Sequence, residues 1–190
     1  SVLPLAAEQP EVVKRALRMK KVAGDLCAAI GGRHTHPIAM TVGGFSHFPT
    51  AAELEALGER LEAMRTDMAE TVALFKELAL PTFARETEYL ALRPAQGYGF
   101  IDGVIASSDG GTWPVAQYRQ VTNEFQVSHS TAKRARHRRE SYMVGALARF
   151  NLNYDRLHSQ AQAAAQTLHL LPGSHNSYLI TLAQVVEMVD

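Results

Sequence analysis

Two histidines and an arginine between paired glycines form the most unusual cluster of potentially reactive side chains in this sequence. The stretch GGRHTHPIAMTVGGF, residues 31–45, contains Arg33, His34 and His36. Glycine tolerates positive φ and close backbone approach, so two glycine pairs this close together predict tight geometry at both ends of the loop. On an extended segment, residues two apart share a face, which would place His34 and His36 side by side.

Three interpretations of this loop remain open from the residues alone. The loop could simply pack, with its imidazoles hydrogen-bonded to backbone carbonyls. It could bind a metal, because imidazole is a ligand for zinc, copper, iron and nickel, although two histidines leave the ligand set incomplete. It could also lie at a partner interface or near a redox centre that other groups ligate. There His36 would tune a neighbour electrostatically or move protons.

A second cluster is the basic run KRARHRR, residues 133–139, with five lysines and arginines and no acid. Such a run can neutralise phosphates, so nucleic-acid binding is its functional alternative. On a helix, however, seven residues span about two turns and their charges spread around the cylinder. A solvated or ion-paired helix face is therefore the favoured interpretation, and we expect no nucleic-acid partner.

The remaining reactive residues form no pattern of this kind. Ser128–His129 and Ser174–His175 are sequence neighbours, whereas a nucleophile and its base must meet in space with an orienting acid. Cys27 is the single cysteine, which excludes an internal disulfide framework and a four-cysteine metal site within this chain. We expect Cys27 to be buried on a helix as a small apolar residue. No residue is predicted to be catalytic or to bind a metal.

Composition is that of an ordinary globular protein. The 190 residues are 46% hydrophobic, and 19 basic residues balance 19 acidic ones. The net charge therefore does not indicate a nucleic-acid or membrane partner. No apolar run reaches the length needed to cross a bilayer and no signal-peptide pattern opens the sequence, so we expect a cytoplasmic protein without a membrane partner. The chain begins without methionine and ends in a helical pattern without a stop signal. We therefore expect an internal fragment of a longer protein.

Hydrophobic periodicity predicts the elements around these clusters. A helix is predicted over residues 10–30, and Thr50 with Glu53 predicts a capping box at the start of a second helix that lasts until Pro81. Turn residues and β-rich runs predict a small antiparallel sheet between about residues 85 and 127. Further helices are predicted from Ser130, over about 154–170, and after a cap at Ser174. The fold class is α+β, mostly helical, in one compact unit over residues 1–190.

At this point three stretches carry a resemblance to a known family. GGRHTHPIAMTVGGF resembles the glycine–glycine–basic, histidine–proline and valine–glycine–glycine stretch in the middle of large (alpha) subunits of nickel–iron hydrogenases. The preceding EVVKRALRMKKVAGDLCAAI is similar to the helix that leads into that motif, and RARHRRESYMVGALARFNLN resembles a later helix of the same subunits. The similarity is to the cytoplasmic class that works with pyridine-nucleotide or similar electron carriers.

The resemblance implies reversible oxidation of dihydrogen by the complete hetero-oligomeric enzyme, an oxidoreductase with a nickel–iron centre and iron–sulfur clusters in partner subunits. The family binds nickel through two paired-cysteine motifs, and this sequence has neither, so the fragment alone is expected to hold no cofactor and to be inactive. By resemblance, Arg33, His34 and His36 would lie on a loop facing the small subunit and its nearest cluster. The partners would be the small subunit and electron-transfer subunits. A metal-free structural relative remains the alternative.

Overall fold

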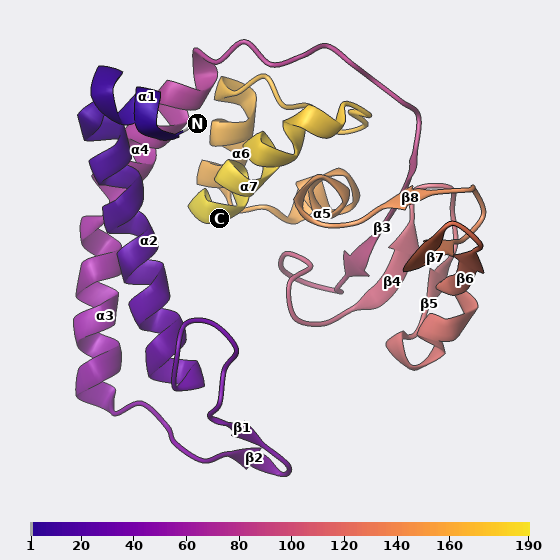
Figure 1. Cartoon of the computed structure of the whole chain (residues 1–190), viewed down its shortest axis with the longest axis horizontal. Coiled ribbons are helices and arrows are strands. Elements are labelled where there is room, and N and C mark those ends of the chain that lie inside the picture. The colour runs from indigo at the N-terminus through magenta and orange to yellow at the C-terminus, as the bar shows by residue number, and fades with distance from the viewer. Residues whose placement is uncertain (1) are drawn as a thin grey trace. The chain divides into compact units, whose positions relative to one another are not determined.

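The computed structural model describes residues 2–190, and contacts between its residues define two compact units, residues 1–70 and residues 71–190. The α+β class predicted from the sequence is confirmed, with helices in both units and the larger sheet in the second (Figure 1). The single compact unit predicted for residues 1–190 stays a prediction. Within the described residues, no helix combines the length and the apolar character that crossing a bilayer requires.

The first unit is built on helices around a short hairpin. Its elements are α1 (Val2–Glu8), α2 (Pro10–Gly31), β1 (Met40–Thr41), β2 (Gly44–Phe45), α3 (Ala51–Ala63) and α4 (Arg65–Lys76), which continues into the second unit. The helix predicted over residues 10–30 is confirmed as α2. A proline occupies its first turn, where the missing N–H costs nothing, and Gly32 ends it in the left-handed conformation at φ 81°.

Helices α2 and α3 lie side by side and are joined more by charge than by a core (Figure 1). The buried apolar residues of α2 are Met19 and Val22, and Leu57 is the buried residue of α3. Arg60 of α3 lies 2.7 Å from Asp25 of α2, and Arg18 of α2 lies 2.8 Å from Asp67 of α4. Exposed ion pairs of this kind contribute little to stability. Because few of its apolar side chains are buried, this unit also has a small apolar core for its length.

Three further sequence predictions concern this unit. The capping box is confirmed: the Thr50 side chain accepts from the Glu53 N–H, and the Glu53 side chain accepts from the Thr50 N–H. The helix predicted to last until Pro81 is divided in two: Met64, at φ −79° and ψ −7°, is a turn residue between α3 and α4, and α4 ends at Lys76. Cys27 is exposed and not buried as predicted. It lies five positions after the buried Val22, and therefore off the buried face of α2.

The second unit packs helices against a four-stranded sheet of order β5-β4-β3-β8. Its strands are β3 (Glu88–Arg93), β4 (Val104–Ser107), β5 (Thr112–Trp113), β6 (Asn123–Val127), β7 (Ser130–Arg136) and β8 (Tyr142–Met143). Its helices are η1 (Val115–Gln120), α5 (Ala146–Asn153), η2 (Tyr154–Arg156), α6 (Ser159–Thr167), η3 (Ser177–Leu179) and α7 (Ile180–Val189). β3 pairs antiparallel with β4 and parallel with β8.

The core of this unit lies where α5 packs on β3 and on α7. The largest fully buried apolar side chains of this unit are Tyr89, Val121, Leu147, Phe150, Leu170 and Val186. The predicted sheet is thus confirmed at β3, β4 and β5, with a parallel strand that the sequence analysis did not predict.

The helix predicted from Ser130 is wrong: residues 130–136 form β7, which pairs with β6 in a separate antiparallel hairpin (Figure 1). Tyr142 and Met143 form β8, and α5 begins only after Gly145 at φ 85°. Cross-strand pairing with residues 123–127 supplies the backbone hydrogen bonds that a helix would otherwise have satisfied internally. Tertiary pairing therefore decided a segment whose local pattern was ambiguous.

The last two predicted helices differ in their bounds. The helix predicted over about 154–170 is shortened to α6, because Leu157 is extended at ψ 145° after η2. Ser174 does not cap the last helix: Asn176 caps η3, its side chain accepting from the Tyr178 N–H at 3.0 Å, and α7 follows η3 without a side-chain cap. The Ser174 carbonyl instead accepts from the Tyr89 hydroxyl.

Candidate functional site

The glycine–histidine loop closes back on the end of α2. The N–H groups of Ile38 and Ala39 both donate to the Gly31 carbonyl, at 2.8 and 2.9 Å. Arg33 Nε donates to the His36 carbonyl at 2.5 Å. These bonds fix the path of the chain between the helix and the hairpin, so the loop is a defined structure and not a slack connection.

Two glycines make this path possible. A Cβ on Gly31 would lie 2.9 Å from the Pro37 Cβ, closer than side chains pack. Gly32 is left-handed, and a Cβ there would lie 3.0 Å from Ile38 Cγ1. In the second pair, Gly43 takes φ 89° at the hairpin turn. The tight geometry predicted at both ends of the loop is confirmed, for the physical reason given by the sequence.

The predicted site residues Arg33, His34 and His36 are all exposed. The segment between them is bent, and His36 takes the left-handed conformation at φ 52°, so they do not lie on an extended strand. A Cβ on Gly24 of α2 would lie 3.8 Å from the His34 Cβ, which shows that His34 lies against this helix. The role assigned to the three residues by resemblance stays a prediction.

The basic run contacts acids and aromatic rings of its own unit. Arg139 binds Asp109 through two nitrogens, at 2.7 and 2.9 Å, and also binds Glu86 at 3.0 Å. The hydrogen bond from Arg139 holds the pKa of Asp109 below its ordinary value. Arg138 lies over the Trp113 ring at 5.6 Å from its centroid.

The other end of the run is also engaged. Lys133 pairs with Glu124 at 3.2 Å, and Arg136 lies over the Phe125 ring at 5.1 Å. Cations already paired with carboxylates or stacked on rings are not a free phosphate-binding stripe. The ion-paired interpretation is thereby favoured over nucleic-acid binding, although on a strand and not on the predicted helix.

A fully buried carboxylate, which the sequence analysis missed, lies beneath this run. Glu88 of β3 accepts from Ser107 Oγ at 2.5 Å, contacts His137 Nδ1 at 2.6 Å, and accepts from the Arg138 N–H at 3.3 Å. Burial by itself would raise the pKa of Glu88, but the hydrogen bonds from Ser107 and His137 outweigh it and lower that pKa. This cluster joins β3, β4 and the segment after β7.

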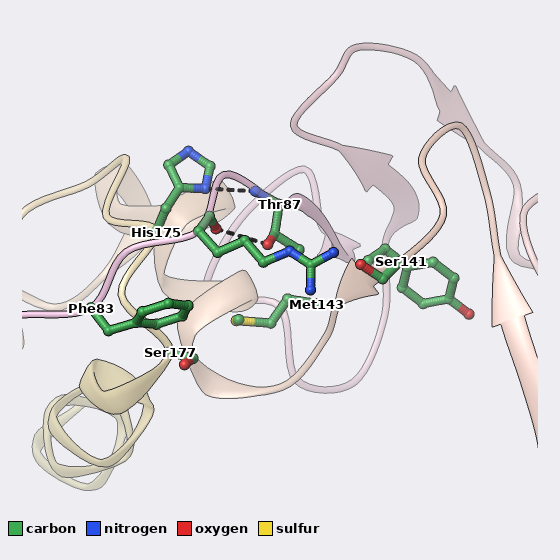
Figure 2. A pocket seen from close by; sticks show the side chains of 8 residues that line it. Phe83, Thr87, Ser141, Met143, His175 and Ser177 are labelled. Atoms are coloured by element: carbon green, nitrogen blue, oxygen red, sulfur yellow. Dashed lines mark hydrogen bonds between the residues drawn. The ribbon is translucent and has the colours of Figure 1, made fainter.

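A hollow of about 310 Å³ in the second unit brings together residues distant in sequence (Figure 2). His175 contacts the Tyr89 ring in a stacked arrangement, and its Nδ1 accepts from the Thr87 N–H at 3.1 Å. The Nδ1 atom of His175 is therefore occupied as a hydrogen-bond acceptor from the backbone. Ser141, Met143 and Ser177 line the same hollow.

Helix α5, which lies in the third stretch that resembles the hydrogenase subunits, is bonded to other elements of the second unit. Arg149 of α5 binds Glu187 of α7 through two hydrogen bonds at 2.7 and 2.8 Å, and Tyr98 donates to the same carboxylate at 2.9 Å. Asn153, fully buried, donates to the Leu92 carbonyl of β3 at 3.0 Å. The polar residues of this motif therefore connect α5 to the sheet and to the last helix.

The side chains of this chain do not fit a nickel–iron centre. By resemblance, such a centre takes four thiolates from two paired-cysteine motifs, and Cys27 is the single cysteine of the sequence. Among the described residues, no three or more His, Cys, Asp or Glu side chains gather in a group that could hold a metal ion. No step of metal chemistry is derived from these residues.

Two curated proteins are similar to this chain in sequence. The chain is 29% identical over its whole length to the sulfhydrogenase 1 alpha subunit of Pyrococcus furiosus, and 26% identical over 94% of its length to the sulfhydrogenase 2 alpha subunit of the same organism. It spans 45% and 41% of these two relatives, less than half of their length. No protein-family model matches the chain.

A solved structure shares the fold. The crystal structure of an NAD+-reducing [NiFe]-hydrogenase in the H2-reduced state contains a chain that matches with a TM-score of 0.83 and 23% identity. The match covers all of this chain and 47% of that one. In sequence and in fold, this chain is therefore similar to part of hydrogenase subunits. The chain is homologous to a portion of the alpha, or large, subunit, which confirms the resemblance found in the sequence.

Proposed function

We propose that this chain is the central, supporting part of a nickel–iron hydrogenase large subunit whose metal-binding thiolates lie elsewhere in the intact protein. The similarity over the complete chain, in sequence to a sulfhydrogenase alpha subunit and in fold to a hydrogenase chain, carries the proposal. The complete enzyme would catalyse the reversible cleavage of dihydrogen into protons and electrons. Electrons would leave through iron–sulfur clusters of partner subunits.

In this proposal the second unit supplies a rigid frame. The buried Glu88 cluster, the Arg149–Glu187 pair and Asn153 connect sheet and helices through polar groups that are nearly all hydrogen-bonded. Frames of this kind hold flanking loops in place, and a bound centre needs its ligands held to within a fraction of an ångström. The role of this unit would be positional and not chemical.

The first unit would supply the contact with the redox partner. Its loop is closed by hydrogen bonds to Gly31 and presents Arg33, His34 and His36 to solvent. A loop of fixed path can bring an imidazole to a constant distance from another subunit's cluster. We therefore assign His36 to the neighbourhood of that cluster, where it would affect electron exit and bind no metal itself.

The test uses the intact protein. Purified with its natural subunits, it should contain nickel and oxidise dihydrogen, whereas residues 1–190 alone should bind no stoichiometric nickel and evolve no hydrogen. Paired cysteines on both sides of this segment in the reading frame would support an enzyme. A reading frame without them, and intact protein without nickel, would favour the metal-free structural relative.

A further inference from the structure

Arg85 lines the hollow of about 310 Å³ in the second unit, and its side chain has no partner in the part of the chain that the structure describes. Each of the other arginines of this unit contacts a carboxylate, a carbonyl oxygen, a histidine, a tyrosine hydroxyl or an aromatic ring. Arg85 is therefore the guanidinium left available for a group from outside these residues. Its position is exposed, so such a group can reach it.

The backbone of Arg85 is fixed although its side chain is free. Its N–H donates to the His175 carbonyl at 3.1 Å, and its carbonyl accepts from the Thr87 hydroxyl at 2.9 Å. The Thr87 N–H in turn donates to His175 Nδ1. These bonds connect residues 85–87 to the segment before η3 and hold the base of the Arg85 side chain at the hollow. Less ordering is then needed when a ligand binds.

The rest of the lining suits an organic anion. Ser141 and Ser177 lie on different sides of the hollow (Figure 2), and neither hydroxyl is hydrogen-bonded among the described residues. Phe83 and Met143 add an aromatic ring and a thioether. No residue that lines the hollow is Asp, Glu or Lys. The hollow thus offers one positive charge, two hydroxyl donors and an apolar wall.

A second hollow, of about 360 Å³, shows what a satisfied arginine looks like in the same unit. It shares His175 with the first hollow, and its own guanidinium belongs to Arg139. Two carboxylates that line this second hollow, Asp109 and Glu86, already bind Arg139. The first hollow has an arginine without these carboxylates, so a carboxylate is the group that would complete it.

Charge and polarity select the kind of anion. A guanidinium can bind carboxylate or phosphate through two parallel hydrogen bonds. A phosphate monoester carries about −1.5 to −2 charges near neutral pH, more than one arginine compensates, whereas a carboxylate carries one. Small-molecule sites combine apolar walls with a few polar groups in volumes from about 300 Å³ upwards. The lining therefore fits a single carboxylate on a short apolar body.

We propose that Arg85, with the hydroxyls of Ser141 and Ser177, forms a carboxylate-binding site whose apolar wall is Phe83 and Met143. Two sources can supply the same chemistry: a small aliphatic acid, or an Asp or Glu side chain from the remainder of the intact protein. The site lies within the second unit and would operate whether or not the intact protein carries nickel.

The experiment uses the intact protein and butyrate as the probe, with the dissociation constant measured by saturation-transfer NMR. Arg85→Gln should weaken butyrate binding about tenfold or more, because it removes a charge-assisted hydrogen-bonded pair. Arg85→Lys should weaken it less, since the charge remains but the planar fork is lost. Ser141→Ala combined with Ser177→Ala should weaken binding about two- to tenfold. Arg119→Gln, at another exposed arginine of this unit, is the matched control and should change binding less than about twofold.

A carboxylate supplied by the protein itself would give a different pattern. Butyrate would then not bind the intact protein, and Arg85→Gln would lower the midpoint of thermal unfolding by about 2 °C or more relative to Arg119→Gln. Either pattern supports a carboxylate site and identifies its source.

Three results would overturn the site. One is butyrate binding that Arg85→Gln leaves unchanged. The second is no butyrate binding together with equal unfolding midpoints for Arg85→Gln and Arg119→Gln. The third is inorganic phosphate bound through Arg85 more tightly than butyrate. Nickel content, measured on the same samples, bears on the proposed function alone.

Discussion

Glu88 and His137 are 49 positions apart in the sequence, yet Glu88 Oε1 and His137 Nδ1 lie 2.6 Å apart in the interior of the second unit. Ser107 adds a third group to the same carboxylate. A buried carboxylate is costly unless it is hydrogen-bonded, and here Glu88 has contacts from Ser107, His137 and the Arg138 N–H. The pair therefore joins the sheet to the chain that leaves β7.

Replacing the carboxylate should destabilise this unit. Glu88→Gln keeps the size of the side chain but removes its charge, and the amide cannot accept from all the donors that surround Glu88. We expect a loss of about 1–3 kcal/mol in the free energy of unfolding, measured by urea denaturation. Glu55→Gln, at an exposed position of α3, is the control and should be close to neutral. Equal losses in both variants would contradict the role given to Glu88.

The same carboxylate predicts that the second unit becomes less stable at acid pH. The pKa values of Glu88 and Asp109 are both lowered in the folded state, Asp109 by its bond to Arg139. Their stabilisation is complete above the unfolded pKa, near about 4, and is lost as pH falls through the lower folded pKa. Urea midpoints should thus change little from about pH 7 to 5 and decrease below about 4. The decrease should be shallower in Glu88→Gln, and an identical slope would refute this assignment.

The pair of Arg149 and Glu187 should contribute more than a surface ion pair. Arg149→Met leaves the Glu187 carboxylate, which is 9% exposed, with the hydrogen bond from the Tyr98 hydroxyl. We expect a cost of about 2–3 kcal/mol, reduced from the fully buried case because solvent reaches the guanidinium. Arg149→Lys should recover part of it, since one bond replaces two. Arg65→Met, in a pair exposed on both sides, should cost about 0.5 kcal/mol or less.

Two glycines provide a matched pair for the loop. Gly32→Ala places a Cβ in the left-handed conformation and 3.0 Å from Ile38, and should cost about 1–2 kcal/mol. Gly58→Ala, within α3 and with nothing within 4 Å of the new Cβ, should stabilise by up to about 1 kcal/mol. Thermal unfolding measures both. A neutral Gly32→Ala would mean that the loop does not need its left-handed residue.

His36 allows the proposed electron-exit role to be separated from metal binding. In the complete complex, His36→Ala should slow electron transfer to the acceptor while nickel content remains near that of the unaltered enzyme. His47→Ala, at another exposed histidine of the same segment, should leave transfer unchanged. Collapse of nickel incorporation with normal transfer per loaded site would show that the interface role of His36 is wrong.

Local signals in the sequence were sufficient where one helix or one turn decides the structure. Pro10 and the glycine pair at residues 31–32 bound α2, and Thr50 with Glu53 caps α3, because each of these effects acts within one turn of chain. Met64 shows the limit of such signals. It ends α3 without a glycine or proline, so nothing in the local pattern marks the break.

Long-range pairing explains most of what the sequence analysis missed. Residues 130–136 have no helical apolar stripe and only a weak strand alternation, and pairing with residues 123–127 decides between the two. Glu88 begins a β-rich run, and the local pattern alone is that of a charged side chain exposed to solvent. Its burial follows from Ser107 and His137, whose approach no local pattern contains. The sequence analysis assigns no site to His175, because its hydrogen-bond partner Thr87 is also far away along the chain.

The parallel pairing of β3 with β8 has a consequence for the order of synthesis. A ribosome releases residues 88–93 long before residues 142–143, and α5, which covers the same strand, follows later still. Until that point the nascent chain carries Tyr89 and Leu90 on a strand that can pair with β4 but lacks its other neighbour, β8, and its covering helix. Chaperone dependence during translation should therefore be greatest over this interval and end once α7 has emerged.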